Sequence, residues 1–145
     1  TEVKKILKKT SSLTIKFFIK ILSLNFIEFV GISDGIFRLR ATGHDPYMNR
    51  SSVRLKPDQH QNIIVRMKVS KGSSVQIFWT TSQHPGYSEK MAVSAPLKPG
   101  QDFQVYRFKM NQHHRWKGQT VTGLRLDPTS GVKGAEIEID WIRGE

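Results

Sequence analysis

Short runs of alternating apolar and polar residues, separated by turn residues, constrain this chain more than any other feature. Residues 62–70 read NIIVRMKVS and residues 75–82 read VQIFWTTS. A period of two is typical of β-strands, because successive side chains point to opposite faces of a sheet. Similar runs occupy residues 25–30, 36–40, 91–93, 104–110, 120–126 and 136–143. Without a convincing helical pattern, these runs predict an all-β protein, an antiparallel β-sandwich of the jelly-roll type.

The tripeptide 71–73, Lys-Gly-Ser, stands between two of these runs and predicts a hairpin turn. In such a hairpin Arg66 and Lys68 share one face, and Gln76 or Trp79 is their cross-strand neighbour, depending on register. We also expect the closing strand, 136–143, to pair with a strand near the start of the chain.

The first residues differ from the rest in charge. Residues 1–20 contain six lysines and one glutamate. We interpret 1–13 as a flexible lysine-rich leader and 14–145 as a single β-sandwich domain, since 145 residues suffice for one core. Residues 15–22 alternate, which favours a strand over an amphipathic helix. Lys16, Lys20 and Glu28 interrupt each apolar segment, so neither a signal peptide nor a transmembrane helix is expected.

Enzyme chemistry has no support in the sequence. The chain has no cysteine, which excludes thiolate chemistry and a disulfide scaffold, and it contains none of the common nucleotide-binding, zinc-protease or hydrolase motifs. Its five histidines lack the spacing of a zinc site. A glycosidase needs two carboxylates across a cleft, and nothing distinguishes Glu89 and Asp127 for that role. We therefore predict that the protein is not an enzyme.

Aromatic and planar polar residues on the predicted strands are instead typical of sugar binding, where aromatic rings stack on sugars and planar polar groups bind hydroxyls. Trp141 shares the parity of Ile137 and Ile139, so we expect it to be packed. Trp79 fits the core and a binding site equally well, whereas Trp116 lies in the polar segment NQHHRWKG and favours a role in binding or in clamping the loop. The candidate rings are Tyr47, Trp79, Tyr87 and Trp116, and the candidate hydroxyl partners are Arg66, Lys68, Gln76, Glu89 and Arg125.

Four segments carry a resemblance to a known family: SDGIFRLRATGHDPYM (33–48), VQIFWTTSQHPGYSEKMAV (75–93), RWKGQTVTGLRLDPTSG (115–131) and AEIEIDWIRG (135–144). In order and spacing they resemble the jelly-roll carbohydrate-binding modules attached to secreted bacterial polysaccharide-degrading enzymes. The resemblance implies a monomeric, extracellular, non-catalytic module that binds polysaccharide and no membrane. It also implies a catalytic domain outside this chain, which the module brings to the polysaccharide. Residues 1–30 depart from the usual opening strands of such modules.

The same resemblance implies a structural calcium ion where the first and last strands meet. Asp140 matches the position of the carboxylate that the closing strand provides, and Glu28 is the nearest further ligand. An aspartate inside an apolar strand is costly to bury unless it is paired or bound to a metal. The alternative is that Asp140 lies at a bulge and binds backbone amides or an arginine.

The net charge of +11 leaves a second function class open, a basic β-sandwich that binds nucleic acid or another polyanion. Against it, the strand-borne cations are spread over several strands, and no RNA-binding aromatic signature accompanies them. An acidic polysaccharide would reconcile the charge with sugar binding, and a sandwich that merely spaces domains is a third possibility. The cations in question are Arg38, Arg40, Arg66, Lys68, Arg107 and Lys109.

Overall fold

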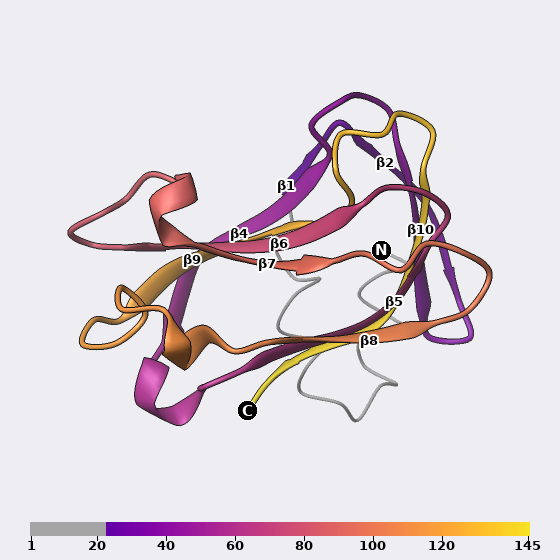
Figure 1. Ribbon diagram of the computed structural model, residues 1–145. Helices are drawn as coiled ribbons and strands as arrows, with labels where there is room; N and C mark the ends of the chain where they lie inside the picture. Colours follow the sequence, from indigo (N-terminus) through magenta and orange to yellow (C-terminus); the bar gives the residue numbers. More distant parts are fainter. Residues whose placement is uncertain (1–22) are drawn as a thin grey trace.

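Two antiparallel five-stranded sheets pack face to face in the computed structural model, which describes residues 23–145 (Figure 1). This architecture confirms the predicted all-β sandwich. The first sheet contains, in spatial order, Ser23–Asn25 (β1), Tyr47–Leu55 (β4), Val121–Asp127 (β9), Ser74–Thr81 (β6) and Ala92–Pro96 (β7). The second sheet contains Ile27–Ser33 (β2), Ile36–Ala41 (β3), Glu136–Gly144 (β10), Ile63–Val69 (β5) and Gln104–Phe108 (β8).

Three short 3₁₀ turns complete the fold: Pro57–Gln59 (η1), Glu89–Met91 (η2) and Met110–Gln112 (η3). Within residues 23–145 no helix has the length and apolar character needed to cross a membrane. The expected leader, 1–13, and the expected strand, 15–22, lie outside the described residues.

Alternation along each strand fills the space between the sheets. Ile77 and Leu126 are inward neighbours on β6 and β9, while Val65, Met67 and Ile137 project from the other sheet. All five side chains are at most 2% exposed. Burying apolar side chains from two facing sheets is what stabilises a sandwich, at about 25 cal/mol per Å² of apolar surface.

The sequence pattern missed strands β1 and β4. Strand β4 reads YMNRSSVRL, and its register against β9 shifts between Ser51 and Leu55. Ser52 adopts a left-handed backbone conformation, with φ of 59°. This irregularity and the polar residues on either side of it interrupt the period-two pattern, so that no alternating run identifies the strand.

The predicted hairpin at residues 71–73 is wrong, because β5 and β6 belong to different sheets. The Lys71-Gly72-Ser73 segment crosses from one sheet to the other, and Gly72 has φ of +126°. A Cβ at Gly72 would meet the Thr129 hydroxyl, which donates a hydrogen bond to the Lys71 carbonyl at 2.6 Å. Local alternation cannot distinguish two paired strands from two facing ones, since in both cases one face of each strand is buried.

The closing strand β10 pairs with β3 and β5, in agreement with the expected pairing to a strand early in the chain. Its register against β5 shifts between Ile139 and Trp141, so that Asp140 is the extra residue of a bulge. The bulge reverses the parity of the strand, and Ile142, not Trp141, is buried. The prediction that Trp141 packs in the core is therefore wrong. Trp141 is half-buried outside the core, with the Arg143 guanidinium 4.1 Å from its ring centroid.

Trp79 and Trp116 are both fully buried, with 0% exposure, and this corrects their prediction as sugar-stacking platforms. Their rings meet edge to face, with centroids 5.2 Å apart. Trp79 Nε1 donates to the Arg115 carbonyl at 3.3 Å, and Trp116 Nε1 donates to the His60 carbonyl at 3.0 Å. Trp116 thus anchors a polar loop to the end of the sandwich.

We expect Trp116→Ala to lower the free energy of unfolding by about 3–5 kcal/mol, because it leaves a cavity and an unpaired His60 carbonyl. Urea denaturation measures the change. Val105→Ala is the control, since Val105 is 58% exposed and should change stability by less than about 0.5 kcal/mol. A loss below about 1 kcal/mol for Trp116→Ala would contradict its placement in the core.

Candidate functional site

The residues on the outer face of the first sheet alternate with those that point into the core. Because Ile77 and Trp79 point into the sandwich, Gln76 and Phe78 point out of it. Strand β9 lies beside β6, and its outward residues are the cross-strand partners of these two. Asp127 lies opposite Gln76, and Arg125 lies opposite Phe78.

Neighbouring strands extend this face in both directions. On one side Asn49 of β4 lies opposite Arg125, and Tyr47 lies opposite Asn25 of β1. On the other side Ser94 of β7 lies opposite Gln76. We call the resulting surface the polar face. It consists of Asn25, Asp45, Tyr47, Asn49, Gln76, Phe78, Tyr87, Glu89, Ser94, Arg125 and Asp127.

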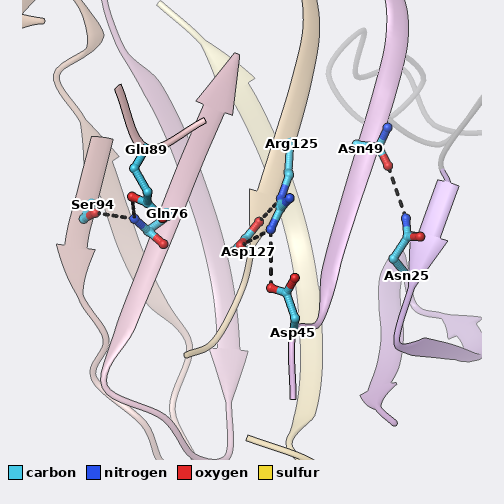
Figure 2. A network of polar contacts seen from close by, with 8 residues as sticks. All are labelled: Asn25, Asp45, Asn49, Gln76, Glu89, Ser94, Arg125 and Asp127. Carbon is cyan, nitrogen blue, oxygen red and sulfur yellow. Dashed lines mark hydrogen bonds and ion pairs between the residues drawn. The ribbon is translucent and has the colours of Figure 1, made fainter. Parts of the chain in front are cut away.

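Arg125 is the centre of the polar face (Figure 2). Its Nε and Nη2 donate to the two carboxylate oxygens of Asp127, at 2.6 and 2.7 Å, and Nη2 also reaches Asp45 Oδ1 at 3.4 Å. Its guanidinium carbon lies 3.7 Å from the ring centroid of Tyr47 and 4.8 Å from that of Phe78. Two-pronged pairing and ring contact together fix the guanidinium plane.

Further hydrogen bonds hold the amide side chains of the face in place. Gln76 Nε2 donates to Glu89 Oε2 at 3.1 Å and to Ser94 Oγ at 3.0 Å. Asn25 Nδ2 donates to Asn49 Oδ1 at 3.4 Å, as Figure 2 shows. Amide and carboxylate groups fixed in this way keep donors and acceptors available on an open surface.

Tyr87 comes from the loop before β7 and lies across β9 at Gly123. A Cβ at Gly123 would fall 2.8 Å from the Tyr87 hydroxyl and 2.5 Å from Thr80 Oγ1, so only glycine allows this approach. Burial raises the pKa of Tyr87, although a hydrogen bond with Asn49 opposes that effect. The tyrosine is therefore a neutral, amphipathic group at neutral pH.

Burial also raises the pKa of Asp127, and the Arg125 ion pair opposes it. The charges of Asp45 and Glu89 raise the same pKa further. The polar face thus carries one guanidinium and three carboxylates, in a chain whose net charge is +11. Neutral hydroxyl-bearing ligands suit such a face better than polyanions do.

The predicted ligand-binding residues separate into three groups. Gln76, Tyr87, Glu89 and Arg125 lie together on the polar face, and so does Tyr47. Trp79 and Trp116 are in the core, as described above. Arg66 and Lys68 stand on β5 in the second sheet, so they are not neighbours of Gln76; the wrong hairpin caused this error.

Sequence reasoning did not select several residues of the polar face. The sequence distinguishes Asp127 only as half of a possible carboxylate pair, and Asn49 stands on the strand that the pattern misses. Arg125 and Asp127 are two residues apart on one alternating run, and this spacing is the one sequence signal that places both on the same face. The residues that the prediction omitted are Asn25, Asp45, Asn49, Phe78, Ser94 and Asp127.

The outer face of the second sheet holds the expected cations, and most are paired with carboxylates. Lys68 Nζ and Arg38 Nε contact the two oxygens of Glu138 at 2.5 and 2.9 Å. The remaining contacts are Arg66–Asp140 (2.5 Å), Arg40–Glu28 (3.4 Å) and Arg107–Glu145 (3.0 Å). This face is therefore a mixed ion-pair network and not a basic patch.

Asp140 and Glu28 do not share a calcium site in this arrangement. Strand β3 separates their strands, Glu28 faces Arg40, and Asp140 binds Arg66 at the bulge. Among residues 23–145 no three histidine or acidic side chains come close enough to hold a metal ion. The prediction that Asp140 and Glu28 bind one calcium ion together is therefore wrong. Asp140 instead fits the alternative, in which it lies at a bulge and binds an arginine. Calcium binding itself stays a prediction.

No protein-family profile matches the sequence, and no curated protein matches it either. Solved structures with the same fold do match. A family 29 carbohydrate-binding module superposes with a TM-score of 0.61 at 12% identity, over 86% of this chain and 77% of that one. A lysine-to-alanine variant of such a module, in complex with cellulohexaose, gives 0.61 at 12% identity, over 86% and 79%.

A third similar structure is a low-affinity xylan-binding module of family 86 from the gut symbiont Roseburia intestinalis. Its TM-score is 0.54 at 10% identity, over 86% of this chain and 88% of that one. Each of these likenesses covers 86% of this chain. They show that the chain has the β-sandwich fold of carbohydrate-binding modules.

We expect Glu138→Gln to lower the free energy of unfolding by about 1 kcal/mol at pH 7. The hydrogen bond from Lys68 lowers the pKa of Glu138, with burial opposing it and Arg38 adding to it. A carboxylate with a lowered pKa stabilises the fold above its ordinary value, near 4.5, and loses that effect as the pH falls. Urea denaturation from pH 7 to pH 3 should therefore show the two proteins converging on the acid side.

Glu28→Gln is the matched control for this experiment, because Glu28 is 55% exposed and its ion pair with Arg40 is longer, at 3.4 Å, and therefore weaker. At pH 7 it should change stability by less than Glu138→Gln does. A constant difference between wild type and Glu138→Gln over the whole pH range would contradict the ion-pair explanation.

The calcium prediction has its own measurement. If a structural calcium ion is bound, a chelator lowers the melting temperature, and added Ca²⁺ restores it. Asp140→Asn should then lower the melting temperature and remove its response to Ca²⁺. An unchanged melting temperature in the chelator, with no metal in the purified protein, would reject calcium.

Proposed function

We propose that this protein is a non-catalytic polysaccharide-binding module and that the polar face is its binding surface. The observation that carries the proposal is the Arg125 guanidinium, held by Asp127 and stacked on Tyr47 in an open sheet face beside Tyr87. The shared fold with carbohydrate-binding modules supports it. The fold alone would not be sufficient, because one fold hosts many functions.

Sugar recognition needs apolar ring faces beside planar hydrogen-bonding groups, and the polar face supplies both. Tyr47 and Tyr87 offer rings with a polar tip. Arg125, Asp127 and Gln76 offer paired donors and acceptors for hydroxyl groups. Five strands at about 4.8 Å spacing make this surface roughly 19 Å wide, which suits several consecutive sugars.

A neutral sugar backbone is the ligand that we propose for this face. The three carboxylates of the polar face would repel a uniformly acidic polymer at close range. Of the similar structures, one is bound to cellulohexaose and another is a low-affinity xylan-binding module. By this analogy we propose a plant-type or microbial polysaccharide of the same general kind for the present chain.

The absence of catalysis is part of the proposal. Both oxygens of Asp127 accept hydrogen bonds from Arg125, and Glu89 accepts one from Gln76. Carboxylates engaged in this way bind a ligand more readily than they transfer protons. We propose that the module is a secreted monomer that holds an attached enzyme, outside this chain, near its substrate.

Nucleic-acid binding remains the alternative, and the second sheet argues against it. On its outer face Glu138 pairs with Arg38 and Lys68, Asp140 with Arg66, and Glu28 with Arg40. In addition, residues 1–20 hold six of the chain's 23 cationic side chains and only one acidic residue, so the rest of the chain is less basic than the net charge of +11 suggests. A polyanion surface would require unpaired cations on one face.

We expect Tyr47→Ala to weaken glycan binding by about 1–3 kcal/mol, by analogy with bases stacked on aromatic rings. Isothermal calorimetry with soluble cello- and xylo-oligosaccharides measures the loss. Trp141→Ala is the matched control, because Trp141 is also a half-buried ring stacked on an arginine, but on the second sheet. Equal losses in the two variants, or no loss in Tyr47→Ala, would contradict the proposed surface.

A further inference from the structure

A groove of about 390 Å³ runs beside the polar face, where the edge strands β7 and β8 of the two sheets meet. Figure 1 shows these two strands lying one above the other, each at the edge of its own sheet. The groove is lined by Ser94 from β7, Arg107 from β8, and Lys109, Gln112 and His113 from the segment that follows β8. Its polar lining residues come from both sheets.

The charge of the groove is opposite to that of the polar face. Two cations line it, and no carboxylate does among the described residues that form it. Arg107 contacts Glu145 at 3.0 Å, but both side chains are more than 40% exposed, so the pair is weak. Lys109 is exposed on the same segment. Residues 107–117, RFKMNQHHRWK, contain four lysines and arginines and no acidic residue.

His113 makes the inner wall of the groove rigid. Its ring meets Trp79 edge to face at 4.9 Å and stacks on His114 at 4.9 Å. The backbone N–H of Arg115 donates to His113 Nδ1 at 3.1 Å. Burial lowers the pKa of His113, and the charges of His114 and Arg115 lower it further. The imidazole is thus neutral near pH 7, and Arg107 and Lys109 supply the groove's positive charge.

Ser94 connects the two surfaces. Its hydroxyl accepts the hydrogen bond from Gln76 at one end of the polar face, as Figure 2 shows, and it also lines the groove. A glycan chain that crosses the strands of the polar face therefore reaches the groove as it passes β7. Substituents on that chain would meet Arg107 and Lys109.

We propose that this groove binds anionic substituents, carboxylate or sulfate, of a polysaccharide whose neutral backbone lies on the polar face. The inference rests on the proposed function and makes its ligand more specific. The polar face excludes a uniformly charged polymer, and the groove selects sparse negative charge at one position. Two cations in an exposed groove act mainly by a screened Coulomb attraction, which falls as salt is added.

The test compares three soluble polymers with one backbone: hydroxyethyl cellulose (neutral), carboxymethyl cellulose of low substitution and cellulose sulfate of low substitution. Affinity gel electrophoresis at about 50 mM and 500 mM salt measures binding to each. We expect wild type to bind one or both anionic polymers roughly tenfold more tightly than the neutral one at low salt. This preference should disappear at high salt, and the more strongly bound anionic polymer identifies carboxylate or sulfate.

The double variant Arg107→Gln/Lys109→Gln should bind hydroxyethyl cellulose as wild type does and lose the anionic preference. The charge-matched control is Lys98→Gln/Lys133→Gln, which removes two exposed lysines that do not line the groove and should keep the preference. Circular dichroism and melting temperature confirm that each variant is folded.

Three results would overturn the inference. Equal binding of neutral and anionic polymers by wild type would do so, and so would an anionic preference that the groove variant retains. Tighter binding of a single-stranded DNA oligomer, lost in the groove variant, would assign the groove to nucleic acid. If wild type binds no hydroxyethyl cellulose and no oligosaccharide, the proposed function itself fails, which is a separate outcome.

Discussion

The edge-to-face contact between Trp79 and Trp116 is the interaction on which both surfaces of this protein depend. Trp79 shares the inward parity of Val75 and Ile77 on β6, and that parity turns Gln76 and Phe78 outward onto the polar face. Trp116 closes one end of the sandwich and holds the loop after β8, where His113 packs on the outer edge of Trp79. A buried aromatic pair with both indole N–H groups satisfied can hold a polar loop in one conformation.

The fold could be read from the sequence, because alternation is a local property with a direct physical cause. Eight of the ten described strands follow from it. What local alternation cannot specify is which strands become neighbours, as the separation of β5 and β6 into two sheets illustrates. Local alternation also cannot reveal a bulge. The single extra residue at Asp140 places Trp141 outside the core, where alternation predicts it to be buried.

The candidate site was only partly predictable for the same reason. Of the predicted binding residues, the structure brings Gln76, Tyr87, Glu89 and Arg125 together on one face. Large rings suit sugars, which favours the two tryptophans as platforms, yet large rings also gain most from burial. Asn49 could not be placed without β4. Arg125 and Asp127 pair because both point outward from the same strand. This pairing can be predicted only when the outward face of that strand is known.

Charge is distributed in this protein so that its total is a poor guide to its ligand. The net charge of +11 suggests a polyanion, but the polar face carries more carboxylates than cations, and the second sheet neutralises most of its own arginines and lysines. At one edge, between β7 and β8, Arg107 and Lys109 line a groove to which no acidic residue contributes among the described residues. A ligand would therefore experience two adjoining surfaces of opposite preference. The order in which a sugar chain crosses them, and not the net charge, would decide which polysaccharide binds.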